Sequence, residues 1–332
     1  MTITSEPTAT AARPAKRAAV TVLVWLFLLP VAGWSVIRFG GWEAGPLVQV
    51  LAFTPYAAAW ALFPVLIATF SRRWLAAAVS VVAAALLAVN VLPRAIADED
   101  RGPAVGLRLQ VLSANVLAGD ADPETIVALV RDHDVAVLAM QEFTPAIQSG
   151  LTAAGLDTLL PHSSVVAEYG TPGSAVYSRF PITAAGARRN GGGFMQAYGT
   201  IHPAGAVPVA IESVHPVAPF DSHVLGDWRN DIANQPRADR TGTPRILLGD
   251  FNATLDHEVL RDLISSGYRD AADVDGSGLL GTWGPYGGLP IPAVTIDHVL
   301  VDRRIGVRDV RVHAIPRSDH RSVLASLTVP SA

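Results

Sequence analysis

Carboxylate, amide and histidine side chains recur in this sequence directly after short apolar runs, where β-strands are expected to end. They lie within a stretch of about 200 residues and are Asn115, Glu142, His215, Asp250, Asn252, Asp297, Asp319 and His320. Because each one borders an apolar run, we expect all of them to project from one edge of a β-core. Oxygen and imidazole groups in this number suit one divalent metal, one phosphate and one attacking water.

Taken singly, several of these residues also have a plain structural explanation. Glu142 ends the run VAVLAMQE, and an acid at the edge of a buried strand is costly unless it is paired with a base or bound to a metal. Asn115 is equally compatible with a turn, and His215 with a structural histidine at a strand end. Their functional interpretation therefore rests on the whole set.

The segment LLGDFN, residues 247–252, is the sharpest single motif. Asp250 and Asn252 are two residues apart and share a face if the strand continues through them. A carboxylate there can orient or deprotonate water, and an amide can hold water or a phosphoryl oxygen. The alternative explanation is a simple hairpin turn.

The C-terminal part of the chain contains two Asp–His dipeptides. Asp297 and His298 are neighbours in an expected strand, so their side chains face opposite ways; we expect Asp297 to join the site and His298 to be structural. Asp319 and His320 precede the last expected strand. An Asp–His pair formed across strands would fix the tautomer of the imidazole and raise its basicity.

Short apolar runs and Gly/Pro-rich loops dominate residues 107–332, without a regular alternation of strand and helix. This pattern predicts an α/β fold, a two-sheet sandwich with helices outside. The helices are expected at residues 123–132, capped near Asp122, and 257–265. The expected strands are residues 107–113, 135–141, 173–178, 207–214, 245–248, 295–301 and 322–327.

The first 93 residues have a different character, because residues 18–93 carry almost no charge. Residues 1–17 predict a disordered tail. Three apolar stretches, residues 18–37, 47–70 and 74–92, are each long enough to cross a bilayer, and we expect a three-helix anchor over residues 18–93. A buried helical core and a signal peptide are the alternatives. Residues 94–106 are expected to form an exposed tether to the domain at 107–332.

Basic residues predict the orientation of this anchor. The tail is basic and Arg72-Arg73 separates the second and third stretches, so the positive-inside rule places both in the cytoplasm. Three crossings would then place the domain at 107–332 outside the cell membrane.

Composition narrows the functional classes. The chain of 332 residues has no cysteine, which excludes disulfides and zinc–thiolate sites. The first 97 residues hold seven Lys/Arg and two Glu, so 18 Arg and 27 Asp/Glu remain for residues 98–332, a net charge of −9. An acidic domain argues against a broad duplex-DNA-binding face, although bound metal can supply local positive charge.

The succession N…QE…H…GDFN…W…IDH…SDH resembles the endonuclease/exonuclease/phosphatase (DNase I-like) superfamily over residues 106–329, and the segment Ser-Arg-Phe-Pro-Ile at 178–182 adds support. The resemblance implies a four-layered two-sheet sandwich. It also implies a metal-dependent phosphoric ester or diphosphate hydrolase that uses Mg²⁺ or Mn²⁺. Glu142 would be the principal metal ligand, with Asn115 and Asp319 near the metal.

The same resemblance implies the catalytic roles. His320, oriented by Asp297, would take the proton of the attacking water. Asp250 and Asn252 would orient that water and bind the phosphate. His215 would contact a phosphoryl oxygen or assist the leaving group, and Trp283 would lie beside the substrate.

The layout resembles small membrane-anchored bacterial members of the superfamily, some of the VanJ type linked to teicoplanin resistance. That resemblance implies a lipid phosphate substrate at the membrane surface, such as undecaprenyl pyrophosphate, and no protein partner is evident. A surface nuclease acting on extracellular nucleic acid, with Arg188-Arg189 and Arg303-Arg304 near its pocket, is the alternative. A catalytically silent membrane scaffold is a third possibility.

Overall fold

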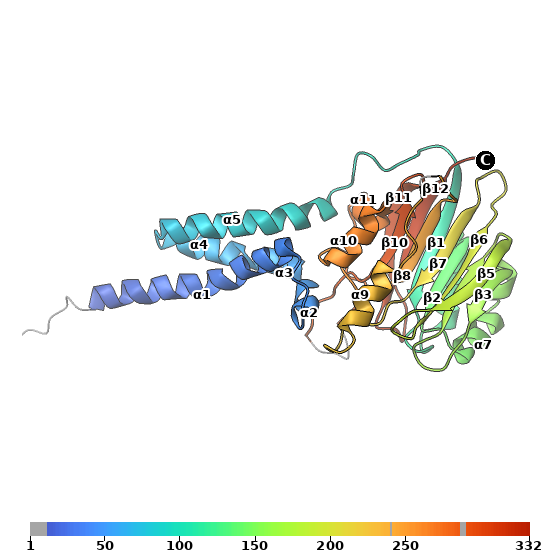
Figure 1. The fold of residues 1–332 in the computed structure, drawn as a ribbon, viewed down its shortest axis with the longest axis horizontal. Helices are drawn as coiled ribbons and strands as arrows, with labels where there is room; N and C mark the ends of the chain where they lie inside the picture. Colours follow the sequence, from blue (N-terminus) through green and yellow to red (C-terminus); the bar gives the residue numbers. More distant parts are fainter. Residues whose placement is uncertain (1–11, 240, 286–289) are drawn as a thin grey trace, which may run out of the picture. The chain divides into compact units, whose positions relative to one another are not determined.

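The computed structural model describes residues 12–239, 241–285 and 290–332 (Figure 1). The chain separates into two compact units. The first contains the residues up to Trp42 together with Thr54–Val91, and the second contains Glu43–Phe53 and Leu92–Ala332. The segment Glu43–Phe53, named the α2 segment from here on, therefore interrupts the first unit in sequence but belongs to the second.

The first unit consists of apolar helices: α1 (Ala12–Gly40), α3 (Thr54–Trp60), α4 (Leu62–Phe70) and α5 (Trp74–Val91). Small residues let α1 and α5 approach closely, and the Ser35 hydroxyl lies 3.3 Å from the carbonyl of Ala83. Many large apolar side chains are exposed, and Phe70 is 84% exposed. By length and composition alone, Ala15–Gly40 and Trp74–Ala95 could each cross a membrane.

The second expected span, residues 47–70, is not one helix. It divides into α2 (Leu47–Leu51), α3 and α4, and the apolar stretch Thr54–Phe70 is shorter than the other two helices. Pro55 and Pro64 have no backbone N–H, so the helical hydrogen bonds to the carbonyls four residues earlier cannot form, and the helix is interrupted there. Three membrane-spanning helices are therefore not confirmed.

Two further boundaries differ from the expectation. Residues 12–17 of the predicted disordered tail are already part of α1, and residues 1–11 lie outside the described residues. Residues 94–106, expected to be a tether, belong to the second unit and are fixed to it. Arg94 forms a buried two-pronged ion pair with Asp256, both bonds being 2.7 Å long, and Arg101 pairs with Asp275.

The second unit is an α/β sandwich of two mixed six-stranded sheets. Its helices are η1 (Leu92–Ala95), α2, α6 (Pro123–Asp132), α7 (Pro145–Ala153), α8 (Leu156–Leu159), α9 (Leu225–Ala233), α10 (Glu258–Ser265) and α11 (Ala271–Asp275). Its strands are β1 (Leu107–Asn115), β2 (Val137–Gln141), β3 (His162–Val166), β4 (Ser174–Ser178), β5 (Ile182–Arg189), β6 (Met195–Ile201), β7 (Val209–Val214), β8 (Arg245–Asp250), β9 (Tyr268–Asp270), β10 (Asp297–Asp302), β11 (Gly306–Ala314) and β12 (Arg321–Val329).

The strand orders are β11-β12-β1-β2-β4-β3 and β5-β6-β7-β8-β10-β9. Only β1–β2 and β7–β8 pair in parallel, and the other pairs are antiparallel. All nine elements expected in residues 107–332 are present, with ends shifted by at most two residues. The cap at Asp122 is also present, its carboxylate accepting the N–H of Thr125.

Strand alternation explains the layers. Along β8, Ile246 and Leu248 face the core between the two sheets, and Leu247 faces the opposite side. The outer side of the first sheet packs on α6 and α7, and the outer side of the second packs on α9 and α10. With both faces of both sheets covered, polar side chains gather at the strand ends.

Candidate active site

The sheet topology brings the predicted site residues to one edge of the sandwich. The carboxyl ends of the parallel strands β1 and β2 lie together, with Asn115 opposite Gln141, and those of β7 and β8 do likewise. β10 runs antiparallel to β8 and begins at this edge with Asp297. β12 runs antiparallel to β1, so His320, the residue before it, also lies here.

Glu142 follows β2 in a left-handed backbone conformation, with φ of 59°, which turns its side chain toward the site. Its carboxylate accepts the N–H of Ala118 at 2.6 Å and an N–H of Asn115 at 3.2 Å. The amide of Asn115 also donates to Asp250 at 3.1 Å and so bridges two acids. Burial raises the pKa of Glu142, and the nearby Asp319 charge adds to the effect.

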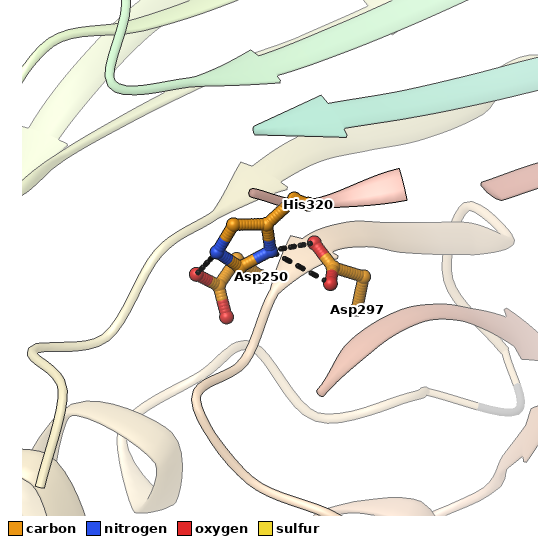
Figure 2. Close-up of side chains that lie close together, drawn as sticks. All are labelled: Asp250, Asp297 and His320. Carbon is orange, nitrogen blue, oxygen red and sulfur yellow. Dashed lines mark hydrogen bonds and ion pairs between the residues drawn. The ribbon is translucent and has the colours of Figure 1, made fainter. Parts of the chain in front are cut away.

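Asp250 and Asp297 face one another in register across β8 and β10. Two buried carboxylates in this position repel each other unless positive charge lies between them. Figure 2 shows that the ring of His320 fills this role: its Nδ1 donates to Asp297 at 2.9 Å, and its Nε2 lies 3.6 Å from Oδ2 of Asp250. The three side chains thus form a charged row with the imidazole at its centre.

The pKa values of these groups follow from that row. Burial by itself lowers the pKa of His320, but Asp297 and Asp250 outweigh it and raise the pKa to about 10. Burial, together with the repulsion from Asp297 and Glu142, raises the pKa of Asp250 to about 7, although His320 acts in the opposite direction. His320 is therefore an imidazolium at neutral pH in this structure.

His215 is the second histidine at this edge and has the opposite charge state. Burial lowers its pKa to about 3, helped by the positive His320, so its ring is neutral. Its Nε2 lies 3.8 Å from Asp250, and Phe194 packs edge-on against the ring. Among the described residues, none hydrogen-bonds to its buried Nδ1.

Asn252 and Asp319 complete the predicted set. The backbone N–H of Asn252 donates to Asp250 at 2.8 Å, and its side-chain amide donates to the carbonyl of Pro216. One oxygen of Asp319 accepts the indole N–H of Trp283 at 3.0 Å. Its other oxygen is buried and has no hydrogen-bond partner among the described residues.

Two groups of side chains offer ligands for a metal ion. Asp250, Asp297 and His320 offer ligand atoms within 4.8 Å of one another, but there the imidazolium already balances the carboxylates. Glu142 and Asp319 offer carboxylate oxygens, one of them buried and unpartnered. Such oxygen ligands suit a hard divalent cation. Asn115 turns its NH₂ group, and not its oxygen, toward the acids, so here it positions Glu142 and Asp250.

A cavity of about 530 Å³ lies over this edge. Glu142, His215, Asp250, Asn252, Asp319 and His320 all line it, whereas Asn115 and Asp297 stand behind them. Most of the remaining lining residues are apolar, and they include Trp283. This volume is within the range of small-molecule binding sites.

Several residues that shape the site had no clear signal in the sequence. The Thr282 hydroxyl accepts the N–H of Asp297 and fixes the start of β10. The N–H of Ala118 holds Glu142, and the left-handed backbone of Leu117 and Ala118, before Gly119, is what turns it inward. The α2 segment contributes to the cavity wall although its apolar sequence suggested a membrane helix.

His298, beside Asp297, faces away from the cavity. Its Nδ1 donates to Asp270 at 2.6 Å and its Nε2 donates to the carbonyl of Ala253 at 2.8 Å. Both partners are acceptors, so the ring must carry a proton on each nitrogen. Burial opposes that charge, but Asp270 outweighs it and the pKa of His298 is raised.

Comparisons with known proteins agree with this architecture. Residues 112–320 match the family described as Endonuclease/Exonuclease/phosphatase. No curated protein matches the chain. A solved endonuclease/exonuclease/phosphatase from Beutenbergia cavernae is 17% identical with a TM-score of 0.55, covering 67% of this chain and 72% of that one.

Two other solved structures are also similar to this chain. Truncated TDP2 from Caenorhabditis elegans is 14% identical with a TM-score of 0.55, covering 67% of this chain and 98% of its own. The Neisseria 3′ phosphatase NExo, bound to a product DNA hairpin, is 19% identical with a TM-score of 0.51, covering 65% and 98%. Identities this low show a shared fold, whereas the family match covers most of the chain. With the acids and histidines at its strand ends, this protein belongs to the endonuclease/exonuclease/phosphatase family and is a phosphoester hydrolase.

Proposed function

We propose that the protein is a membrane-anchored, Mg²⁺-dependent phosphoesterase that hydrolyses a phosphodiester or pyrophosphate bond of an envelope lipid such as undecaprenyl pyrophosphate. The observation that carries the proposal is the cavity itself. Its catalytic acids and histidines share the cavity with a mostly apolar lining, and none of the described residues that line it is Lys or Arg. This suits a phosphate or pyrophosphate group joined to an apolar remainder.

The first unit supports the membrane part of the proposal. Large apolar side chains on its surface, among them Phe70, Leu75 and Val89, are more than 70% exposed. So much exposed apolar surface is unfavourable in water and is expected where lipid covers it. The basic N-terminal residues favour a cytoplasmic position for that end, and if the shorter stretch Thr54–Phe70 also crosses, the three crossings put the catalytic unit outside. A role in teicoplanin resistance would follow if the lipid belongs to cell-wall synthesis.

The chemistry that we assign to the site is attack of water on phosphorus. Asp297 holds Nδ1 of His320, so Nε2 is the atom that exchanges a proton with the water. The 3.6 Å between Nε2 and Asp250 is too long for a direct hydrogen bond, and a shared water can contact both. Asn252 and the neutral His215 both line the cavity, and we assign them to hold phosphoryl oxygens or the leaving group.

A divalent metal fits the oxygen ligands of Glu142 and Asp319. The buried oxygen of Asp319 without a hydrogen-bond partner is unfavourable unless a cation compensates it. A divalent cation bound there would neutralise charge on the phosphate and favour the deprotonated water. Positive charge near these acids also offsets the attraction of the carboxylates for the proton of His320. That proton must leave Nε2 before His320 can act as a base.

A surface nuclease is the second candidate, because the Neisseria 3′ phosphatase NExo was solved with a product DNA hairpin. The arginines that could favour this alternative are largely engaged within the protein. Arg188 pairs with Glu212, Arg189 with Glu168, and Arg304 with Asp302. Phosphate backbones need accessible cations, so these ion pairs favour the lipid substrate.

Hydrolysis assays with the full-length protein in detergent test the proposal. With Mg²⁺, we expect phosphate release from undecaprenyl pyrophosphate and no cleavage of plasmid or single-stranded DNA. His320→Ala should abolish the release. His202→Ala is the matched control, because His202 is an exposed histidine just after β6, beside the start of β7 and so at the opposite end of the second sheet.

The outcomes separate the candidates. Release of phosphate from lipid that is lost in His320→Ala and kept in His202→Ala supports the lipid phosphoesterase. Cleavage of DNA without turnover of lipid would overturn it in favour of the nuclease.

A further inference from the structure

The wall of the active-site cavity comes partly from the α2 segment. Val48, Gln49, Ala52 and Phe53 of this segment line the same cavity as Glu142, Asp250 and His320. All of these residues belong to the second unit. A segment that lies between two apolar helices in sequence is therefore part of the catalytic unit and of its substrate cavity.

Buried polar contacts fix the α2 segment at its N-terminal end. The carboxylate of Glu43, which is buried, accepts the backbone N–H of Glu258, the first residue of α10. It thereby caps a helix 215 positions away in sequence, where a negative charge is favoured. The guanidinium of Arg229 in α9 also donates to the carbonyl of Glu43.

His257 and Gln49 fix the middle of the segment. The N–H of Thr254 donates to Nδ1 of His257 at 2.9 Å, so the ring proton is on Nε2, which donates to the carbonyl of Val48 at 2.8 Å. The side chain of Gln49 donates to the carbonyl of Pro219 at 2.6 Å. Val48 itself is fully buried within the core cluster that contains Trp228. These buried contacts therefore fix this part of the cavity wall within the second unit.

The composition of the wall determines what it can bind. Ala52 and Phe53 are half-buried at the cavity, and Phe194, Phe220 and Ile291 line it from other parts of the unit. The described lining contains no Lys or Arg, and the buried His257 is in its neutral form. A sugar ring with many hydroxyls would lose hydration against this wall without gaining partners.

We infer that the α2 segment is a specificity element that binds the apolar chain of the substrate next to its phosphate, through Ala52 and Phe53. The substrate class is an alkyl or isoprenyl phosphate or pyrophosphate in which the chain is attached directly to the phosphate. A cavity of about 530 Å³ holds only the carbons nearest to the phosphate, so the rest of a long chain must extend beyond it. This inference rests on the proposed function and names its substrate class.

A chain-length series on the full-length protein tests the inference. Isopentenyl, geranyl and farnesyl pyrophosphates, with five, ten and fifteen carbons, are compared for kcat/KM with Mg²⁺, and their monophosphates for binding by calorimetry. We expect kcat/KM and affinity to rise about tenfold or more from five to fifteen carbons, because each buried methylene strengthens binding. Bis(p-nitrophenyl) phosphate, which has no alkyl chain, reports the basic hydrolytic chemistry.

Ala52→Glu places a carboxylate in the apolar wall. We expect it to reduce the ratio of the farnesyl to the isopentenyl values to near one. Val50→Glu is the matched control, since Val50 is in the same α2 segment, is 39% exposed and does not line the cavity. It should keep the wild-type ratio. Because a ratio within one variant is independent of the fraction folded, partial misfolding does not imitate the effect.

Each result has one meaning. Chain-length dependence that disappears in Ala52→Glu supports the inference. Hydrolysis of the pyrophosphates and of bis(p-nitrophenyl) phosphate without any chain-length dependence would overturn the inference and keep the phosphoesterase. Monophosphate binding that depends on chain length, without turnover of the pyrophosphates, would keep the binding role and overturn the proposed function.

Discussion

Two buried Asp–His pairs stand on opposite faces of β10, and they differ in one respect. In the cavity pair, Asp297 and His320, the second ring nitrogen faces Asp250 at 3.6 Å and borders the cavity. In the core pair, Asp270 and His298, the second nitrogen donates to the carbonyl of Ala253 at 2.8 Å. Both rings are charged by an aspartate. Only the cavity pair keeps a nitrogen available for a substrate or water.

The comparison teaches that an Asp–His pair is not by itself a sign of catalysis. The core pair is fully satisfied, so its ring can only stabilise the fold, by joining β9 and β10 to the loop after β8. The cavity pair joins β10 to the start of β12 and leaves its outer nitrogen unsatisfied. Changes at the two pairs and at the neighbouring acids should separate the two roles.

Removing the ring of the cavity pair should have the largest effect on activity. For His320→Ala we expect kcat to fall about 10³-fold, the scale of a lost general acid–base group. The assay is hydrolysis of bis(p-nitrophenyl) phosphate with Mg²⁺, alongside thermal unfolding. If His320→Ala unfolded more readily than His298→Ala but kept its turnover, the roles of the two pairs would be reversed.

Removing the ring of the core pair should affect stability instead. His298→Ala leaves the carboxylate of Asp270 buried without its cation, and both side chains are at most 2% exposed. Breaking such a pair costs about 3–5 kcal/mol of unfolding free energy. Denaturant unfolding measures the loss, and turnover per folded molecule should stay near that of the wild type. If turnover fell as far as in His320→Ala, the core pair would have a catalytic role.

The cavity pair also differs from the core pair in having Glu142 and Asp319 close by. Glu142→Gln keeps the shape but removes a charge, so we expect the Mg²⁺ concentration for half-maximal activity to rise about 10- to 100-fold. A chelator should abolish the activity of the wild type. An unchanged Mg²⁺ requirement in this variant would indicate that the metal binds to Asp250, Asp297 and His320 instead.

The smallest expected effect is the pH dependence of the core pair. The pKa of His298 is raised above its ordinary 6.5, and the nearby charged groups include Asp270, Asp273 and Asp297. The stabilisation from its charged ring is therefore complete below pH 6.5 and is lost as the pH rises through the raised pKa. The destabilisation by His298→Gln should be larger at pH 6 than at pH 9. Equal losses of unfolding free energy at both values would mean that the ring is neutral.

Much of this arrangement could be predicted from the sequence. Apolar runs of five to nine residues that end in Asn, Glu, His or Asp predicted the strands β1, β2, β7 and β8 and their shared edge, because chemistry at a sheet edge needs polar residues directly after buried ones. Alternation along β10 predicted that Asp297 and His298 face opposite ways, and their different partners agree with this. Strands with mixed patterns were missed, such as β5, where all seven residues after Ile182 are small or polar.

Only the tertiary structure decided the place of the α2 segment. Residues 47–53 are as apolar as the helix that follows, and hydropathy alone cannot distinguish a side chain that faces lipid from one that faces a protein core. Contacts with His257 and Glu258, more than 200 residues away, join this segment to the catalytic unit. The sequence by itself determined which residues could hold a phosphate and activate water. The folded chain determined which wall faces them, because such long-range contacts leave no periodic pattern in the sequence.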